Sequence, residues 1–141
     1  MELDDLYQEI ILDHSKKPRN YGELANATAH AHGDNPACGD EIDVHLLLND
    51  QDVVQDIRFT GQGCAISQAS ASMMTLKIKG KTKEEALDML QSFQHMLIDA
   101  NEPKELPKTF GELKLLKSIR KFPQRVKCAT LAWQALKQAL S

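Results

Sequence analysis

The sequence contains no apolar run long enough to cross a bilayer, which takes about 20 residues in a helix. Its first ten residues, MELDDLYQEI, are acidic and amphipathic, unlike a signal or transit peptide. The 17 Lys and Arg against 20 Asp and Glu give no reason to expect binding to nucleic acid. These absences favour a cytoplasmic protein that binds neither membrane nor nucleic acid. Because no obvious apolar stripe is left exposed, we also expect a monomer.

Cysteine is scarce, with three in 141 residues, and an odd number cannot pair completely in internal disulfides. No two cysteines form the Cys-x-x-Cys of a thioredoxin-like site or a zinc ribbon. The Gly61-x-Gly63 pair is not a dinucleotide-binding fingerprint either, because the third glycine position is Ile66. In a reducing compartment, such thiols are buried small hydrophobic residues, metal ligands or nucleophiles.

The pattern of apolar residues predicts strands first and helices afterwards. Alternation predicts short strands over residues 26–34, 41–48 and 53–60, joined by polar turns. Helical spacing predicts helices over residues 2–15, 65–79 and 111–121, another that a Thr82–Glu85 capping box begins, and a last one from Pro123. With no repeat and no long linker, residues 1–141 are expected to form a single domain. We predict an α+β fold, a three-stranded antiparallel sheet with helices packed on one face.

Each cysteine stands where the backbone turns sharply or where a helix begins. Cys38 lies in NPACGD, Cys64 follows the Gly-x-Gly at a predicted helix start, and Cys128 falls in the first turns of the last helix. A helix N-terminus lowers the pKa of a thiol and so favours the thiolate, which binds metal or attacks sulfur. Arg125 and Lys127 add positive charge beside Cys128. These positions favour metal binding or nucleophilic chemistry over a packing role.

Asp40 is a fourth candidate, because the Cys-x-Asp spacing across Gly39 can turn both side chains toward one point. Three thiolates and one carboxylate would complete a tetrahedral zinc site. Thiolates select zinc or iron–sulfur clusters, and the carboxylate is the weaker, exchangeable ligand. An Asx-type turn or a solvated loop carboxylate explains Asp40 equally well at this level.

The five histidines are expected to be ordinary surface or boundary residues. His30 and His32 share one strand face, where a place at the sheet surface is favoured over a ligand role. His14 is expected at the polar end of the first helix.

Three motifs, NPACGD, GQGCAISQASASMMT and RVKCATLAW, occur in this order. With them the chain resembles the IscU/NifU-N family of iron–sulfur cluster assembly proteins along nearly its whole length. It is most similar to the SufU branch of Gram-positive bacteria. Lys127 stands where the housekeeping branch has a histidine, and the span between the second and third cysteines is longer than in that branch. The element KFPQRVK replaces the Leu-Pro-Pro-Val-Lys that housekeeping scaffolds offer to a dedicated Hsp70 chaperone.

The SufU resemblance implies a zinc-dependent sulfurtransferase that works with a PLP-dependent cysteine desulfurase of the SufS type and with downstream Suf scaffold proteins. Matched by motif, the zinc ligands are Cys38, Asp40, Cys64 and Cys128. Cys38 is the expected catalytic residue, which accepts sulfur as a persulfide. Arg125 also matches a family position that serves the site or the docking of the partner.

Two other function classes stay open. One is a scaffold on which a transient iron–sulfur cluster forms and is handed on; the other is a purely structural zinc protein. Lys127 in place of histidine favours the sulfurtransferase over the scaffold. Asp40 and the loop position of Cys38 disfavour a permanent structural site, which would gain from a fourth thiolate or a histidine.

Overall fold

The computed structural model describes residues 3–36, 39–98 and 108–141. In chain order the elements are α1 (Leu3–Lys16), β1 (Ala29–Asn35), β2 (Asp40–Leu48), β3 (Val54–Gln62), α2 (Ala65–Ile78), α3 (Lys83–Ile98), the 3₁₀ segment η1 (Lys108–Lys121) and α4 (Pro123–Leu140). Every predicted element is present, with ends that differ by a few residues. Within the described ranges, no helix combines the length and the apolar character needed to cross a membrane.

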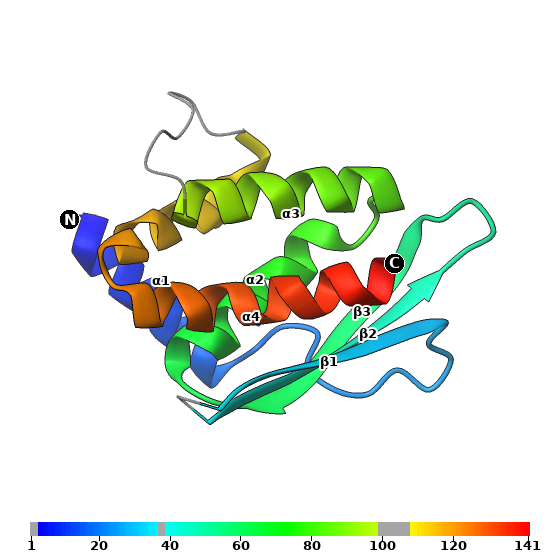
Figure 1. Ribbon diagram of the computed structural model, residues 1–141, viewed down its shortest axis with the longest axis horizontal. Coiled ribbons are helices and arrows are strands. Elements are labelled where there is room, and N and C mark those ends of the chain that lie inside the picture. Colours follow the sequence, from blue (N-terminus) through cyan, green and yellow to red (C-terminus); the bar gives the residue numbers. More distant parts are fainter. Residues whose placement is uncertain (1–2, 37–38, 99–107) are drawn as a thin grey trace.

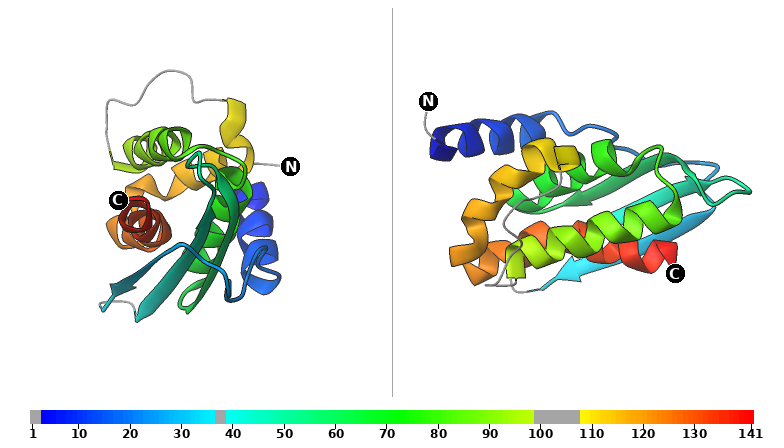
Figure 2. Two further views of the ribbon diagram at one scale, coloured as in Figure 1. Left: turned by 90° about the vertical axis from the view of Figure 1, so that its right-hand side faces the viewer. Right: turned by 90° about the horizontal axis from the view of Figure 1, so that it is seen from above.

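The three strands form one antiparallel sheet in the order β1-β2-β3. Alternation along β2 places Ile42, Val44 and Leu46, all fully buried, on the same face. Helices α2 and α4 pack on this face, and α3 lies farther from the sheet, against α4 (Figure 1). Figure 2 shows the same arrangement from the side and from above. The predicted α+β class, with helices packed on a three-stranded antiparallel sheet, is confirmed.

Helix α2 runs through the centre of the molecule and contacts α1, α4, β3 and η1. Small side chains such as Ala69 and Ala71 are fully buried, so neighbouring elements can approach its backbone closely. Buried serines need hydrogen-bond partners. Ser70 bonds to α4, whereas Ser72 bonds to α1 and to the segment after it. Helix α2 is therefore joined to α1 and α4 by hydrogen bonds as well as by packing.

Helix α3 begins at the predicted capping box. The Thr82 N–H donates to the Glu85 carboxylate at 3.0 Å, and the Glu85 N–H donates to the Thr82 hydroxyl at 3.2 Å. Farther along, the Phe93 ring stacks on Trp133 of α4 with ring centroids 4.3 Å apart. This stack joins α3 to the helix that carries Cys128.

Two expectations need refinement. Residues 111–121 are helical, as predicted, but they belong to a longer 3₁₀ segment whose backbone is interrupted at Gly111, with a positive φ of 51°. His14 lies in the last turn of α1, as expected, but it is only 2% exposed and so is buried rather than at the surface. Its Nδ1 is 2.7 Å from the Ser72 hydroxyl and its Nε2 is 3.1 Å from the Glu112 carboxylate. His14 therefore links α1 to α2 and η1.

Candidate metal centre

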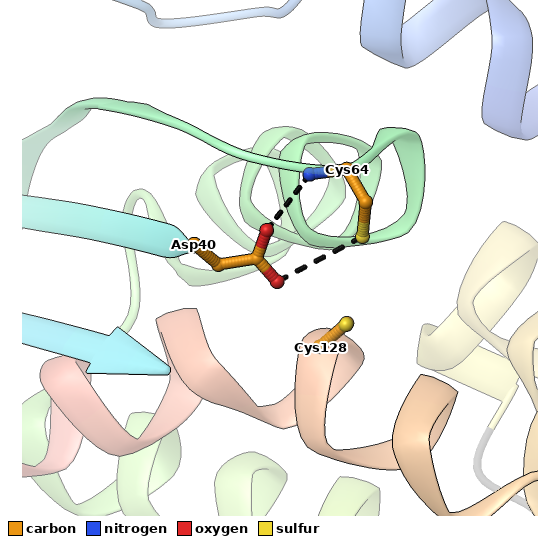
Figure 3. Close-up of side chains that lie close together, drawn as sticks. All are labelled: Asp40, Cys64 and Cys128. Atoms are coloured by element: carbon orange, nitrogen blue, oxygen red, sulfur yellow. Dashed lines mark hydrogen bonds between the residues drawn. The ribbon is translucent and has the colours of Figure 1, made fainter. Parts of the chain in front are cut away.

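Asp40 is the first residue of β2 and lies on the face of the sheet that the helices cover. Its side chain is fully buried. One carboxylate oxygen, Oδ1, accepts the backbone N–H of Cys64 at 2.8 Å, and the other, Oδ2, lies 3.8 Å from Cys64 Sγ (Figure 3). A carboxylate costs free energy when buried unless it is paired. Asp40 is therefore not a solvated loop residue, which removes one of the two ordinary explanations for it.

The Gly-x-Gly between β3 and α2 makes this approach sterically possible. A Cβ at Gly63 would lie 2.2 Å from Asp40 Oδ1, and a Cβ at Gly61 would lie 2.1 Å from the Glu41 carbonyl oxygen. Both glycines have positive φ, 149° at Gly61 and 156° at Gly63, which a side chain disfavours. Gly61 thus lets the end of β3 lie close beside the start of β2 in the sheet, and Gly63 leaves room for Asp40 next to Cys64.

Cys64 occupies the N-cap position of α2, directly before the helix begins at Ala65. Its side chain makes no capping hydrogen bond and is exposed. The Ser67 hydroxyl donates to the Cys64 carbonyl oxygen at 3.0 Å and holds this first turn. The position of the thiol is therefore set by the start of α2, and its sulfur is not used to cap that helix.

Cys128 enters from the second turn of α4 and is 5% exposed. The helix-start argument predicts a lowered thiol pKa, but the structure differs. Burial raises the pKa of the Cys128 thiol, and hydrogen bonds and negative charge from Asp40 and Cys64 raise it further. Arg125 and Lys127 are exposed and do not offset this burial. A cation among these donors would reverse the balance, because a coordinated thiol loses its proton.

The donor atoms of Asp40, Cys64 and Cys128 all lie within 4.8 Å of one another. Figure 3 shows the three side chains turned toward one point from β2, from the start of α2 and from α4. Ligands about 2.0–2.3 Å from a tetrahedral zinc ion stand about 3.3–3.8 Å apart. Asp40 Oδ2 and Cys64 Sγ, at 3.8 Å, already have this spacing, and the widest pair would have to approach by up to about 1 Å. Two thiols with one carboxylate also suit zinc chemically. The residues fit a metal ion.

Among the residues that the structure describes, the other candidates considered from the sequence are not part of this group. Cys38, predicted as the fourth ligand and as the sulfur acceptor, lies outside the described residues. Arg125 is exposed in the first turn of α4, with its guanidinium carbon 4.6 Å from the centre of the Phe122 ring. His30 and His32 are exposed on the outer face of the sheet, where both contact the Asp43 carboxylate.

A family model described as NifU-like N terminal domain matches residues 6–141. The chain belongs to this family. Relatives in the family include the iron–sulfur cluster assembly scaffold protein IscU of Streptococcus pyogenes, which is 45% identical over 99% of this chain and 85% of its own length. The zinc-dependent sulfurtransferase SufU of Bacillus subtilis is also 45% identical, over 99% of this chain and 92% of its own length.

The fold agrees with a solved structure of a candidate iron–sulfur cluster assembly scaffold protein for the SUF system from Fervidobacterium islandicum. The TM-score is 0.86 at 37% sequence identity, over 94% of this chain and 95% of that one. The chain is thus an iron–sulfur cluster assembly protein of the IscU/NifU-N family. One relative is a scaffold and the other a sulfurtransferase, and both are 45% identical to this chain. Sequence identity therefore does not decide between the two functions.

Proposed function

We propose that this protein is a zinc-dependent sulfurtransferase of the SufU branch, which accepts sulfur on Cys38 from a PLP-dependent cysteine desulfurase of the SufS type. The observation that carries this proposal is the convergence of two thiols and one buried carboxylate within 4.8 Å. The similarity to the Bacillus subtilis sulfurtransferase and the lysine at position 127 support the same choice.

Four residues would hold the ion: Asp40 through Oδ2, Cys64 and Cys128 through Sγ, and Cys38 as the fourth ligand. Bound zinc keeps coordinated thiols deprotonated at neutral pH and lowers their nucleophilicity. Asp40 Oδ1 accepts the Cys64 N–H, so the second carboxylate oxygen would be the one available to a metal ion. Such a ligand set protects the acceptor thiol until the partner docks.

The transfer itself exchanges one sulfur–sulfur bond for another. The Cys38 thiolate attacks the terminal sulfur of the persulfide on the desulfurase cysteine. The new S–S bond forms on Cys38, the old one breaks, and the desulfurase cysteine leaves as a thiolate. No external oxidant or reductant is needed. A downstream Suf scaffold protein then receives the sulfur.

A second function, a scaffold for a transient iron–sulfur cluster, has support from the 45% identity to the Streptococcus pyogenes scaffold protein, which equals the identity to the sulfurtransferase. Thiolates suit iron–sulfur clusters as well as zinc. The two functions differ in what leaves the protein, which is sulfur in one case and an assembled cluster in the other.

The test is the turnover of a SufS-type cysteine desulfurase with and without the zinc-loaded protein, under reducing conditions. We expect strong stimulation, labelled sulfur on Cys38, and loss of both in Cys38→Ala. Protein stripped of zinc serves as a control for the metal. Absence of stimulation, in a protein that assembles and passes on a cluster, would favour the scaffold. Bound zinc with neither activity would favour a structural zinc protein.

A further inference from the structure

A buried hydroxyl joins the two helices that carry the candidate thiols. Ser70 of α2 is fully buried. Its O–H donates to the backbone carbonyl of Ala129 at 2.6 Å, and its oxygen accepts the indole N–H of Trp133 at 3.1 Å. Ala129 directly follows Cys128 in α4. The contact therefore lies one residue from a candidate ligand.

Ser70 is on the helix that Cys64 begins, so its contact with α4 also affects the position of the Cys64 thiol. Ser70 lies six residues after Cys64, or about 9 Å along a helix that rises 1.5 Å per residue. Because an α-helix is stiff over this length, a contact that fixes Ser70 also restricts the position of Cys64. A bond between Ser70 and Ala129 thus limits how far α2 can slide or turn against α4, and with it the separation of the Cys64 and Cys128 sulfurs.

The partner that orients Ser70 is itself fixed. Trp133 is fully buried, and its ring stacks on Phe93 of α3 at 4.3 Å with an interplanar angle of 16°. The indole N–H cannot turn away from Ser70 without breaking this stack. The hydroxyl is consequently aimed at the Ala129 carbonyl, as in the outer shells that orient metal ligands.

We propose that Ser70 is a positioning residue for the metal centre: held between the Ala129 carbonyl and the Trp133 indole, its hydroxyl sets the separation of the Cys64 and Cys128 thiolates and so the metal affinity. This inference rests on the metal site of the proposed function. Ser70 acts through the backbone of α4 and is not a ligand.

Ser72 is a matched control on the same helix. It is also fully buried, and its hydroxyl also has two long-range contacts, with His14 Nδ1 at 2.7 Å and with the Arg19 N–H at 2.8 Å. Both contacts lie toward α1 and the segment after it. Loss of the Ser72 hydroxyl therefore removes a comparable pair of bonds without touching α4.

The experiment compares Ser70→Ala with Ser72→Ala by Zn²⁺ affinity in competition with a chromophoric chelator. The absorption spectrum of the Co²⁺-loaded proteins and the melting temperatures of the metal-free ones are recorded alongside. We expect similar losses of melting temperature. Zn²⁺ affinity should fall about 10- to 100-fold only in Ser70→Ala, with a changed Co²⁺ spectrum. Trp133→Phe keeps the ring stack, loses the N–H, and should change both readouts in the same direction by less. This variant carries the test if Ser70→Ala does not fold.

Parent-like Zn²⁺ affinity and Co²⁺ spectrum in Ser70→Ala would overturn the positioning role while leaving the metal site in place. Equal losses of affinity in Ser70→Ala and Ser72→Ala would also overturn it, because they would report stability alone. A parent protein that binds neither ion would overturn the metal site and this inference together.

Discussion

Asp40 caps helix α2 from another element of the fold. Its Oδ1 accepts the backbone N–H of Cys64 at 2.8 Å, in a position where the side chain of Cys64 itself makes no capping bond. Negative charge at a helix N-terminus is favourable. Its second oxygen faces the thiol of the same residue at 3.8 Å. One carboxylate thus caps the helix start and is also a candidate metal ligand, and these two roles can be separated by substitution.

Asp40→Asn keeps an oxygen for the Cys64 N–H but removes the anionic ligand, whereas Asp40→Ala removes both. We expect zinc affinity to fall at least about 10-fold in both variants. Among the metal-free proteins, Asp40→Ala should be less stable than Asp40→Asn by about 1 kcal/mol, because only it leaves the Cys64 N–H unsatisfied. Chelator competition and urea unfolding measure the two effects. Equal stabilities would show that the capping bond contributes nothing.

Gly63→Ala should distort the candidate metal centre although it replaces none of the residues that could bind the metal. The added Cβ would lie 2.2 Å from Asp40 Oδ1, so the carboxylate or the turn must move. We expect a loss of about 2 kcal/mol or more in unfolding free energy, together with weaker zinc binding. Gly80→Ala is the control, because its φ is also positive at 90° but nothing lies within 4 Å of the added Cβ. This control should cost about 1 kcal/mol from backbone strain alone and leave zinc affinity unchanged. Unchanged zinc binding in Gly63→Ala would contradict the steric argument.

The sheet and its inner face could be predicted because they depend on local alternation. Ile42, Val44 and Leu46 repeat every second residue, and each of them is buried against the helices. The capping box of Thr82 and Glu85 is equally local, with both hydrogen bonds made within four residues. Such features are encoded in short stretches of sequence, so pattern alone is sufficient for them.

The polar contacts inside the molecule could not be predicted, because their partners are distant in sequence. The family resemblance assigns Asp40 and Cys64 to one site, but not the hydrogen bond between them, which spans 24 residues. The bond of His14 to Ser72 spans 58 residues, and that of Ser70 to Ala129 spans 59. The serines of α2 offered only one signal, their small size, which indicates close packing and not hydrogen bonding. The raised pKa of Cys128 has the same origin, since its burial arises only when α4 packs on the sheet.

Thr82→Ala removes the capping box of α3 and should leave the metal centre unaffected. The loss of the Thr82 hydroxyl costs about 1 kcal/mol of unfolding free energy, as at other helix N-caps. Urea unfolding measures this loss, and zinc affinity should match that of the parent protein. A fall in zinc affinity would mean that α3 influences the site more strongly than its contacts with α4 suggest.

The outer face of the sheet should contribute a small pH-dependent stability. The hydrogen bond to Asp43 raises the pKa of His32. Burial alone would raise the pKa of Asp43, but hydrogen bonds from His32 and His30 lower it overall. The His32 contribution is therefore present below its unfolded pKa and is lost as the pH rises through its folded pKa. The Asp43 contribution is present above its unfolded pKa and is lost as the pH falls through its folded pKa.

His32→Gln should consequently be less stable than the parent by a few tenths of a kcal/mol at about pH 5.5, and nearly equal to it at about pH 8. The magnitude is small because the His32 side chain is 46% exposed. Urea unfolding at both pH values measures the difference. A larger difference at the higher pH would reverse the sign and contradict the pairing.

Removal of the proposed zinc ion should lower the stability of the whole protein, because the two buried donors, Asp40 and Cys128, would then lack a cation. At a free zinc concentration about 1,000 times the dissociation constant, binding adds about 4 kcal/mol to the unfolding free energy. For a chain of this length that corresponds to roughly 8–16 °C in melting temperature. A chelator should lower the melting temperature by this order, and excess Zn²⁺ but not Mg²⁺ should restore it. Cys64→Ser removes one donor at an exposed position and should make the melting temperature insensitive to the chelator. An equal effect of the chelator on the parent and on Cys64→Ser would place the stabilising ion elsewhere.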